Sequence, residues 1–407
     1  MLDTPRRAAH RDTSGCLPGS DLSVASVSLP GVGIQGTICD AARLAAAVRA
    51  RHDELYSALI SVETDATART ELRWILAALD SAREIRWLRN RRGIGTVFVS
   101  APATMPMYSL LLFAIAPALV GNEVVVRPAS VSRRCAVLLA DLAVDAGIPI
   151  TVFDGHWEQF EAVAAEAADG VVFAGSAAHA ESLARQLPDR IRLVCQGPGV
   201  CAMVVTESAD VGHAAAVAVA TRLFNNGQDC LATERVYVAA AVFDEFCAAV
   251  VAASKRVRCG ANTDPATDLG PLLIPSVADR WMHRPHEHGT PLTGDGADVA
   301  VVVADADAPV VLSETFCPIL PLVRYDDERE LRSMLELGEF ALGLTIFGAA
   351  PRFGTLDFGH VAIESTHYDH EDAWAPFGGR RGTTFVRTGG VRRAGPVLIP
   401  FQLSEWR

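Results

Sequence analysis

The sequence has no paired cysteine spacing and no Cys-x-x-Cys motif, although nine cysteines occur in its 407 residues. Its polar N-terminal stretch, residues 1–21, has no apolar core of the kind that an export signal needs. Scattered cysteines without an export signal indicate reduced thiols, so we expect a cytoplasmic protein. Glycine, proline and polar residues over 1–20 predict a disordered start to the chain.

Excess basic charge and long apolar runs are also missing. The net charge is -12 at pH 7, which disfavours nucleic acid and anionic membranes as partners, because both bind basic patches. The longest apolar run, 110–120, contains Pro117 and is too short to span a bilayer. The histidines of 283–288 fit no standard zinc spacing, so we expect a solvated loop and no metal site there.

Hydrophobic residues, in contrast, make up 50% of the chain, which is enough to build two or more domains. After two helical patterns, 41–51 and 69–89, short apolar strand patterns alternate with helical ones. This alternation predicts parallel sheets covered on both faces, with a ligand site at the carboxyl edge of the strands. The predicted strands are 96–99, 123–127, 150–153, 170–176 and 191–195, and then 201–205, 234–238, 299–303, 310–312, 343–348 and 396–401; the helices are 108–120, 132–146, 158–168, 213–223, 243–255 and 327–337.

One cysteine is set apart by its surroundings. The run Phe224-Asn225-Asn226-Gly227-Gln228-Asp229-Cys230 presents a thiol just past a Gly-Gln turn, at the end of an Ala/Val-rich helix. A thiol becomes a nucleophile where backbone N–H groups and neighbouring dipoles stabilise its thiolate. The alternative is that Cys230 only fills a core, as most free cysteines do.

Seven segments, in this order along the chain, resemble the motifs of the aldehyde dehydrogenase superfamily. The resemblance extends from about residue 93 to the C-terminus and implies an α/β fold of the aldehyde dehydrogenase type. The segments are 101–106 for P-W-N-x-P, 121–130 for G-N-x-V-V-x-K-P-S, 173–176 for F-T-G-S, 195–199 for E-L-G-G-K, 224–230 for F-x-N-x-G-Q-x-C, 313–318 for E-E-x-F-G-P and 376–379 for P-F-G-G.

The resemblance also implies a domain plan. Residues 1–197 would form a Rossmann-type cofactor domain, and 198–390 a second α/β domain that carries the nucleophile. Residues 391–407 would supply an oligomerisation strand and a contact with the cofactor domain. The insertion that forms the family's protruding hairpin is hard to find before Gly93, so we expect a homodimer.

Roles for single residues follow from the resemblance. Cys230 would attack the carbonyl carbon, and its backbone N–H and the side chain of Thr104 would hold the oxyanion. Glu314 would hold the nicotinamide ribose of NADP or NAD. The residues expected to bind the cofactor are Arg127, Ser130, Gly175, Ser176, Gly197, Glu314 and Phe316.

The sequence departs from the family pattern at several of these positions. Thr104 replaces an asparagine and reaches less far, and Ala180 replaces a glycine on the cofactor side. Arg127 replaces a lysine, which keeps the charge but changes the geometry around a ribose or 2′-phosphate and leaves NAD against NADP open. Gln196 falls at the family's glutamate or its neighbour, depending on the register, and a carboxamide cannot act as a general base.

Loss of that base favours NAD(P)H-dependent reduction of an activated acyl group, a thioester or acyl phosphate, to an aldehyde through acyl-Cys230. The first alternative is NAD(P)-dependent oxidation of an aldehyde to an acid or acyl-CoA, with Glu207 or Asp229 as a candidate base. The second is an inactive homologue with a scaffold role, although a scaffold need not keep Cys230, Gln228 and Glu314.

Two further segments leave alternatives open. The basic run 86–92 is a solvated face or a subunit contact, or else a patch for the phosphates of a CoA- or carrier-bound substrate. The polar segment 367–372 precedes the P-F-G-G match and is either an exposed loop or part of the substrate mouth.

Overall fold

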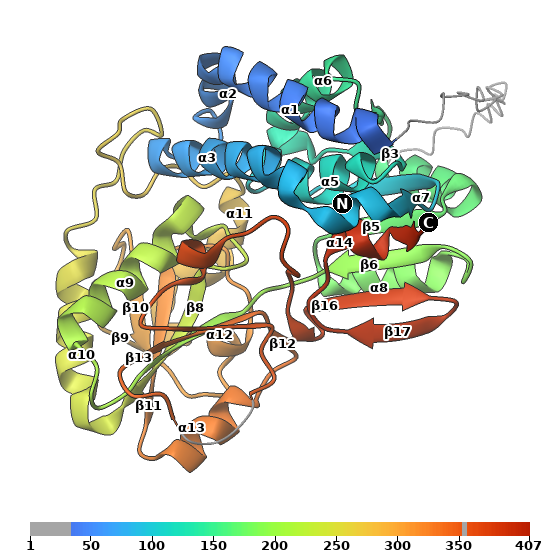
Figure 1. The fold of residues 1–407 in the computed structure, drawn as a ribbon. Coiled ribbons are helices and arrows are strands. Elements are labelled where there is room, and N and C mark those ends of the chain that lie inside the picture. The colour runs from blue at the N-terminus through green and yellow to red at the C-terminus, as the bar shows by residue number, and fades with distance from the viewer. Residues whose placement is uncertain (1–33, 352–355) are drawn as a thin grey trace, which may run out of the picture. The chain divides into compact units, whose positions relative to one another are not determined.

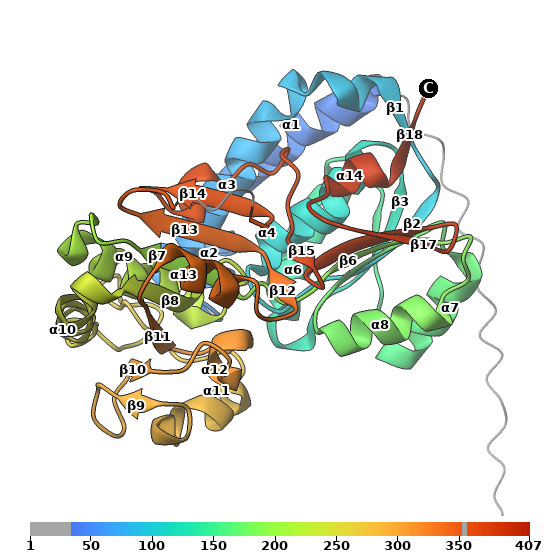
Figure 2. The same ribbon diagram turned by 90° about the horizontal axis from the view of Figure 1, so that it is seen from below.

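The computed structural model describes residues 34–351 and 356–407, with side chains from 39 onward. The expected disordered start, 1–20, therefore lies outside the described residues. Two seven-stranded sheets, each with helices on both faces, form the frame of the molecule (Figures 1 and 2). Within the described ranges, no helix is both long and apolar enough to cross a membrane.

The first sheet has the strand order β17-β16-β6-β5-β2-β3-β4. Strand order changes direction at β2, whose two neighbours are β3 and β5. Ligands of parallel sheets bind beyond the carboxyl ends of the strands at such a point. Five strands are parallel, as the sequence predicts: β2 (Thr96–Ser100), β3 (Glu123–Arg127), β4 (Ile150–Val152), β5 (Gly170–Ala174) and β6 (Arg192–Gln196); β16 (Thr384–Thr388) and β17 (Val391–Ala394) add an antiparallel hairpin to β6.

Alternate residues of these strands face two different layers. Val97 and Val99 pack with the N-terminal helices, whereas Phe98 packs with the helices of the opposite face. The predicted helix 108–120 is confirmed as three consecutive helical segments, with a π-helical turn at Leu111–Ile115. The first layer contains α1 (Ile34–Ala50), α2 (His52–Leu59), α3 (Asp65–Ser81), α4 (Pro106–Leu110), α5 (Ala116–Leu119) and α6 (Arg133–Asp145); the second contains α7 (Trp157–Ala167) and α8 (Ala177–Gln186) (Figures 1 and 2).

The second sheet has the strand order β14-β13-β7-β8-β11-β10-β9, and all but β9 run parallel. Its strands are β7 (Cys201–Val205), β8 (Thr233–Ala239), β9 (Thr290–Pro291), β10 (Ala300–Val303), β11 (Ile319–Tyr325), β13 (Gly343–Phe347) and β14 (His360–Ile363). One face packs against α9 (Val211–Leu223) and α10 (Phe243–Ser254), and the other against α11 (Pro275–Met282), α12 (Pro309–Leu312) and α13 (Glu328–Leu335).

Two predicted strands are wrong. The run 310–312 lies in helix α12, and within 396–401 the chain turns into helix α14 (Ile399–Gln402). Each helix has a proline in its first turn, where the missing N–H costs nothing, whereas a ladder would lose a donor. The predicted helix 69–89 ends at Ser81, before two short 3-10 turns.

The C-terminal segment returns to the first half of the chain. Strand β18 (Ser404–Trp406) pairs antiparallel with β1 (Arg91–Gly93). The guanidinium of Arg91 is buried and lies over the rings of Phe401 and Trp406. Arg91 is therefore not part of a solvated face, whereas Arg86, Arg89 and Arg92 of the same run are exposed. The two-stranded pair β12 (Phe340–Ala341) and β15 (Arg380–Arg381) completes the fold.

Candidate active site

A cavity of about 510 Å³ opens where the two sheets meet. The ends of β2, β5 and β6 supply one wall, and the segments before β8 and β11 supply another. An adjoining cavity of about 300 Å³ shares part of this lining and adds Gln228. Arg127 and Ser130 line neither cavity. The predicted residues around the larger cavity are Thr104, Gly175, Ser176, Gln196, Gly197, Cys230, Glu314 and Phe316.

Cys230 sits at the end of a tight left-handed turn. The backbone angles φ are 49° at Asn225, 59° at Asn226 and 77° at Gly227. Asparagine and glycine adopt this conformation at the lowest cost, so the sequence reverses the chain here locally, just after α9. The turn delivers the half-buried Cys230 to the cavity wall.

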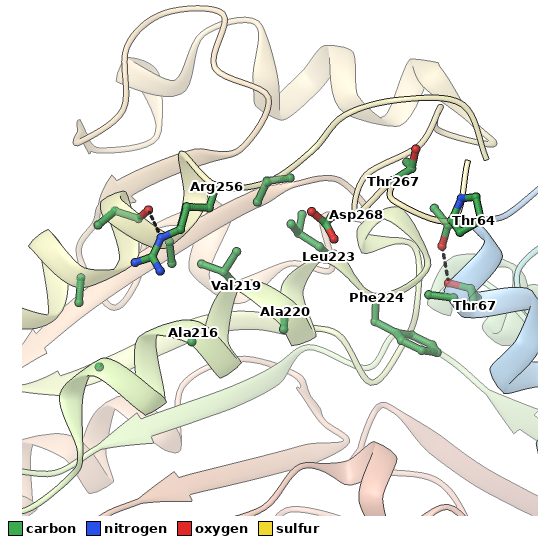
Figure 3. A pocket seen from close by; sticks show the side chains of 17 residues that line it. Thr64, Thr67, Ala216, Val219, Ala220, Leu223, Phe224, Arg256, Thr267 and Asp268 are labelled. Atoms are coloured by element: carbon green, nitrogen blue, oxygen red, sulfur yellow. Dashed lines mark hydrogen bonds between the residues drawn. The ribbon is translucent and has the colours of Figure 1, made fainter. Parts of the chain in front are cut away.

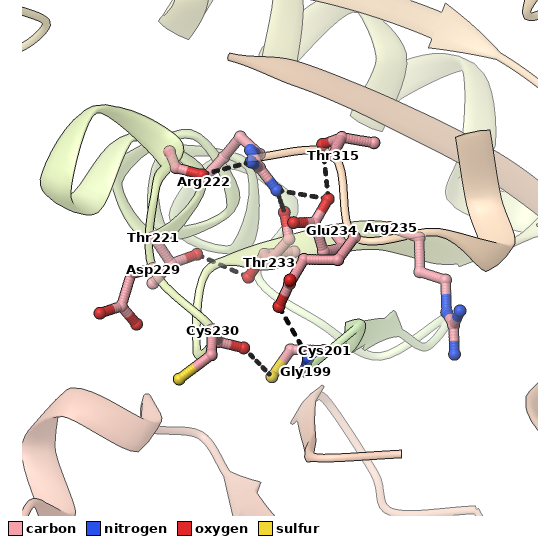
Figure 4. Close-up of polar contacts among 12 residues, drawn as sticks. Gly199, Cys201, Thr221, Arg222, Asp229, Cys230, Thr233, Glu234, Arg235 and Thr315 are labelled. Carbon is pink, nitrogen blue, oxygen red and sulfur yellow. Dashed lines mark hydrogen bonds and ion pairs between the residues drawn. The ribbon is translucent and has the colours of Figure 1, made fainter. Parts of the chain in front are cut away.

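A buried ion pair fixes the turn on the side of α9 and β8 (Figure 4). Arg222 lies 2.7 Å from Glu234 and is fully buried, as is its partner. The same guanidinium donates to the carbonyl of Gly227 at 2.7 Å and to that of Thr233 at 3.1 Å. Thr315 adds a hydrogen bond from its hydroxyl to Glu234 at 2.6 Å. The Arg222–Glu234 ion pair thus holds together the end of α9, the nucleophile turn and the start of β8.

Two side-chain amides of the motif tie the turn to the backbone of Gly270 and Leu273. The side-chain oxygen of Gln228 accepts the N–H of Leu273 at 2.7 Å, and that of Asn226 accepts the N–H of Gly270 at 2.7 Å. These contacts show that both amides position the loop. Sequence reasoning alone found the residues but not this role.

The surroundings of Cys230 are electronegative. Burial, with the negative charges of Asp229 and Glu314, raises the pKa of the Cys230 thiol well above its usual range. Burial also raises the pKa of Asp229 to about 6 and that of Glu314 to about 8. The N–H of Gly199 donates to Glu314 Oε1 at 2.7 Å. Two carboxyls beside the thiol therefore change protonation state near neutral pH.

Gln196 is held on both sides of its amide. Thr384, its partner across β6 and β16, donates its hydroxyl to Oε1 at 2.7 Å. The Nε2 of Gln196 donates to the carbonyl of Phe377 at 3.5 Å. Of the two candidate bases, Asp229 lines the cavity, whereas Glu207 is exposed and does not line it.

Several residues of the site were not predicted individually. The hydroxyl of Tyr368 donates to Asp229 Oδ1 at 3.2 Å, and that of Tyr108 donates to Glu371 Oε1 at 2.7 Å. The segment 367–372 therefore lies beside the nucleophile loop. Its position before the P-F-G-G match was the one signal in the sequence that pointed to this role.

The cofactor side fits a dinucleotide in part. Ser176 caps α8 by accepting the N–H of His179, so the N-terminus of that helix faces the cavity edge, a position suited to phosphate. The guanidinium of Arg127 lies over the ring of Trp157, and its Nε has no partner within the described residues. Ala180 is buried in the core between α8 and the sheet, so its methyl group fills the space that a glycine would leave.

Two other features lie apart from this site. Among the described residues, no group of histidine, cysteine and acidic side chains is arranged to hold a metal ion. A hollow of about 530 Å³ over α9 and α10 is mainly apolar and includes Val219 and Leu223 (Figure 3). It shares only Phe224 with the nucleophile loop, and none of the predicted site residues lines it.

Comparison with known sequences gives one clear family match. The model described as "Aldehyde dehydrogenase family" matches residues 43–395. A succinate-semialdehyde dehydrogenase [NADP(+)] of Mycobacterium avium is 29% identical over 268 residues, which cover 61% of this chain and 57% of that protein. The corresponding protein of Escherichia coli is 27% identical over 74% of this chain and 67% of its own length. The chain thus spans less than two thirds of the first of these relatives.

Solved structures show the same fold. The structure of glyceraldehyde-3-phosphate dehydrogenase from Methanocaldococcus jannaschii with NADP has a TM-score of 0.80 at 20% identity, over 92% of this chain and 89% of that one. A succinic semialdehyde dehydrogenase of Streptococcus pyogenes with NADP+ matches with the same TM-score, identity and coverage.

Proposed function

Because this chain belongs to the aldehyde dehydrogenase family, we propose that it oxidises an aldehyde through an acyl intermediate on Cys230, with NADP or NAD as the oxidant. The observation that carries the proposal is the cavity in which Cys230 meets Thr104, Gln196 and Glu314. The names of the similar proteins, which are semialdehyde dehydrogenases, support oxidation over the reduction that the sequence favours.

Each step up to the thioester on Cys230 has a group in the cavity. The sulfur of Cys230 attacks the carbonyl carbon while its proton passes to the carboxylate of Asp229, which is ionised above its pKa of about 6. The oxyanion is held by the N–H of Cys230 and the hydroxyl of Thr104. Bound NADP or NAD supplies the acceptor for the hydride that leaves the carbon, and a thioester remains on the sulfur.

The test compares wild type with Cys230→Ala on a neutral aldehyde such as butanal. We expect reduced cofactor to form with wild type, and an acyl adduct on Cys230 by intact mass. Cys230→Ala should lose at least about a thousandfold in rate. Cys259→Ala, at an exposed cysteine, is the matched control and should behave as wild type. Oxidation by Cys230→Ala at the wild-type rate would refute the proposal, and wild type that binds neither cofactor would favour a scaffold role.

Gln196 supports a second candidate, in which the acyl group is exchanged with an activated carrier. Its amide is fixed by Thr384 and Phe377 and cannot accept a proton from water. The acyl enzyme would then pass its acyl group to CoA, or form in reverse from a thioester or acyl phosphate and be reduced to an aldehyde. Incubation with acyl-CoA and NADPH or NADH tests this directly: release of aldehyde would support it, and an unreactive Cys230 would refute it.

We also propose a cytoplasmic homodimer with the domain plan 1–197, 198–390 and 391–407. The eight described cysteines are all free, which fits a reducing compartment. The edge strand β14 exposes Val361 and Ile363, which supports a subunit contact. The boundary at 197 falls between β6 and β7, which lie in different sheets, although β16 belongs to the first sheet. Light scattering of the purified protein would measure the mass of the assembly.

A further inference from the structure

The charges around Cys230 point to the class of aldehyde that this site accepts. Resting on the proposed oxidation, we infer that the site selects aldehydes whose far end carries a positive charge and rejects those that carry a carboxylate, and that Asp229 and Glu371 set this preference. The proposal separates this chain from the similar proteins named for succinate semialdehyde, which is an anionic aldehyde.

Acidic side chains line two cavities at the nucleophile loop. The 510 Å³ cavity is lined by Asp229 and Glu314, and its described lining residues include no arginine, lysine or histidine. Leu231, the residue after Cys230, lines a second cavity of about 330 Å³ together with Glu371 and Asp372. Phe377 lines both cavities. Carboxyl groups therefore line both cavities, and the charges of Asp229 and Glu371 both act on the Cys230 thiol.

The basic side chains of the second cavity are three histidines. Burial lowers the pKa of His367 to about 4 and also lowers that of His360, so both are neutral at physiological pH. The exposed His370 is engaged with the hydroxyl of Ser365 at 2.9 Å. His360 and His367 therefore add no positive charge to the second cavity.

Both key carboxylates keep one oxygen available for a ligand. The two donors that hold Asp229, the N–H of Leu231 and the hydroxyl of Tyr368, both reach Oδ1. Tyr108 likewise reaches only Oε1 of Glu371. Oδ2 of Asp229 and Oε2 of Glu371 receive no donor from the described part of the chain. A cationic group in either cavity would thus meet a carboxylate with an oxygen that no described donor holds.

Aromatic rings stand beside these carboxylates. Phe224 and Tyr368 have ring centroids 4.2 Å apart, and Trp74 lies 5.3 Å from Tyr108 and 6.0 Å from Phe224. Aromatic rings attract cations through the ring quadrupole, and carboxylates attract them through their charge. A carboxylate in the same place would be repelled by the acids and would gain nothing from the rings.

No described arginine or lysine forms an ion pair with Asp229 or Glu371. Burial raises the pKa of Glu371 to about 7, so this carboxyl is ionised at pH 8 and partly protonated at neutral pH. The positive charge of Arg222 lowers the pKa of Asp229, but this charge is already paired with Glu234. A positive group on the substrate would supply the missing counter-charge.

The test uses three aldehydes at pH 8 with the full-length protein. The first ends in a trimethylammonium group on a three-methylene chain, the second is its neutral tert-butyl isostere, and the third is succinate semialdehyde. We expect kcat/KM for the cation to exceed that for the isostere by about tenfold or more, and succinate semialdehyde to lie about tenfold or more below it. Because the isostere has the same shape, the ratio reports charge alone.

Two variants test whether Asp229 and Glu371 set the preference for the cationic aldehyde. Asp229→Asn and Glu371→Gln keep size and the acceptor for Tyr368 or Tyr108, and each should lower the cation-to-isostere ratio by about threefold or more. Glu207→Gln removes one exposed charge away from the cavity and is the matched control; its ratio should equal that of wild type. A ratio is insensitive to a general loss of active enzyme.

The outcomes separate this inference from the proposed function. If the neutral isostere is oxidised but the cation is not preferred, or if the ratio is the same in both variants as in wild type, the inference is wrong while the oxidation stands. If none of the three aldehydes is oxidised, both fall together.

Discussion

The two sheets of this protein have the same parallel build, but they present opposite edges to the active site. In the first sheet, Thr104, Gly175 and Gly197 all follow the strands whose carboxyl ends reach the cavity. In the second sheet, Cys230 precedes β8 and Glu314 precedes β11, so the amino edge faces the cavity. The same kind of sheet thus serves two different tasks.

The difference follows from the helix ends that accompany each edge. At the carboxyl edge, helix α8 begins at Ala177, and its free N–H groups favour an anion such as a phosphate. At the amino edge, helix α9 ends at Leu223 just before the nucleophile turn, and its carbonyl end is partly negative. One edge is suited to binding a cofactor, and the other, with Asp229, is suited to accepting a proton.

The largest effect should come from breaking the buried Arg222–Glu234 ion pair at the amino edge of the second sheet. Arg222→Met leaves Glu234 buried without its partner, and we expect the free energy of unfolding to fall by about 3–5 kcal/mol. Urea denaturation measures this. The double variant Arg222→Met/Glu234→Met should recover part of the loss. Arg258→Met, in an exposed pair with Asp268, should cost less than about 1 kcal/mol. Equal losses at both arginines would show that the pair does not hold the edge together.

Placing a carboxylate at position 196, the last residue of β6, should speed hydrolysis of the acyl group on Cys230. Gln196→Glu introduces a general base that still accepts the hydroxyl of Thr384. We expect hydrolysis of acyl-Cys230 to rise about a hundredfold, measured as the decay of the acyl adduct after rapid quench. Gln186→Glu, on the exposed face of α8, is the control. An unchanged decay would mean that water cannot reach the acyl group from this edge.

Filling the carboxyl edge should affect cofactor binding and leave the nucleophile alone. A Cβ at Gly175 would lie 2.9 Å from the ring of Phe173 and next to both cavities. Gly175→Val should raise the KM for NADP or NAD about tenfold or more, while alkylation of Cys230 without cofactor stays as in wild type. Gly294→Val has nothing nearby and serves as control. Faster or slower alkylation in Gly175→Val would show that the two edges are not independent.

The smallest effect tests the negative field of the amino edge. Asp229 is ionised above its pKa of about 6, and its charge then disfavours the thiolate. Asp229→Asn should therefore lower the pKa of Cys230 and speed its alkylation by iodoacetamide at pH 8 about threefold. Burial remains, so the pKa of the thiol stays above its usual range. Rates measured from pH 6 to 10 in wild type, Asp229→Asn and Glu207→Gln give the comparison; a slower Asp229→Asn would reverse the assigned sign.

Short apolar runs mark the limit of sequence-based assignment in this chain. The sequence predicts the strands 123–127 and 201–205 with their observed bounds, because short runs that contain several valines are strand signals, and Pro128 ends the first of them. The runs 310–312 and 396–401 were wrongly assigned as strands, because three to six apolar residues have no measurable period. In both, prolines at the start were the better guide.

The sequence by itself determined the parallel α/β build, the family motifs and the turn at Asn225, Asn226 and Gly227, since each depends on neighbouring residues in the chain. Only the tertiary structure decided what surrounds the thiol. Tyr368 reaches Asp229 across 139 residues of sequence, and Tyr108 reaches Glu371 across 263. Such contacts arise because two sheet edges and a distant loop converge in space, and no local pattern encodes that convergence.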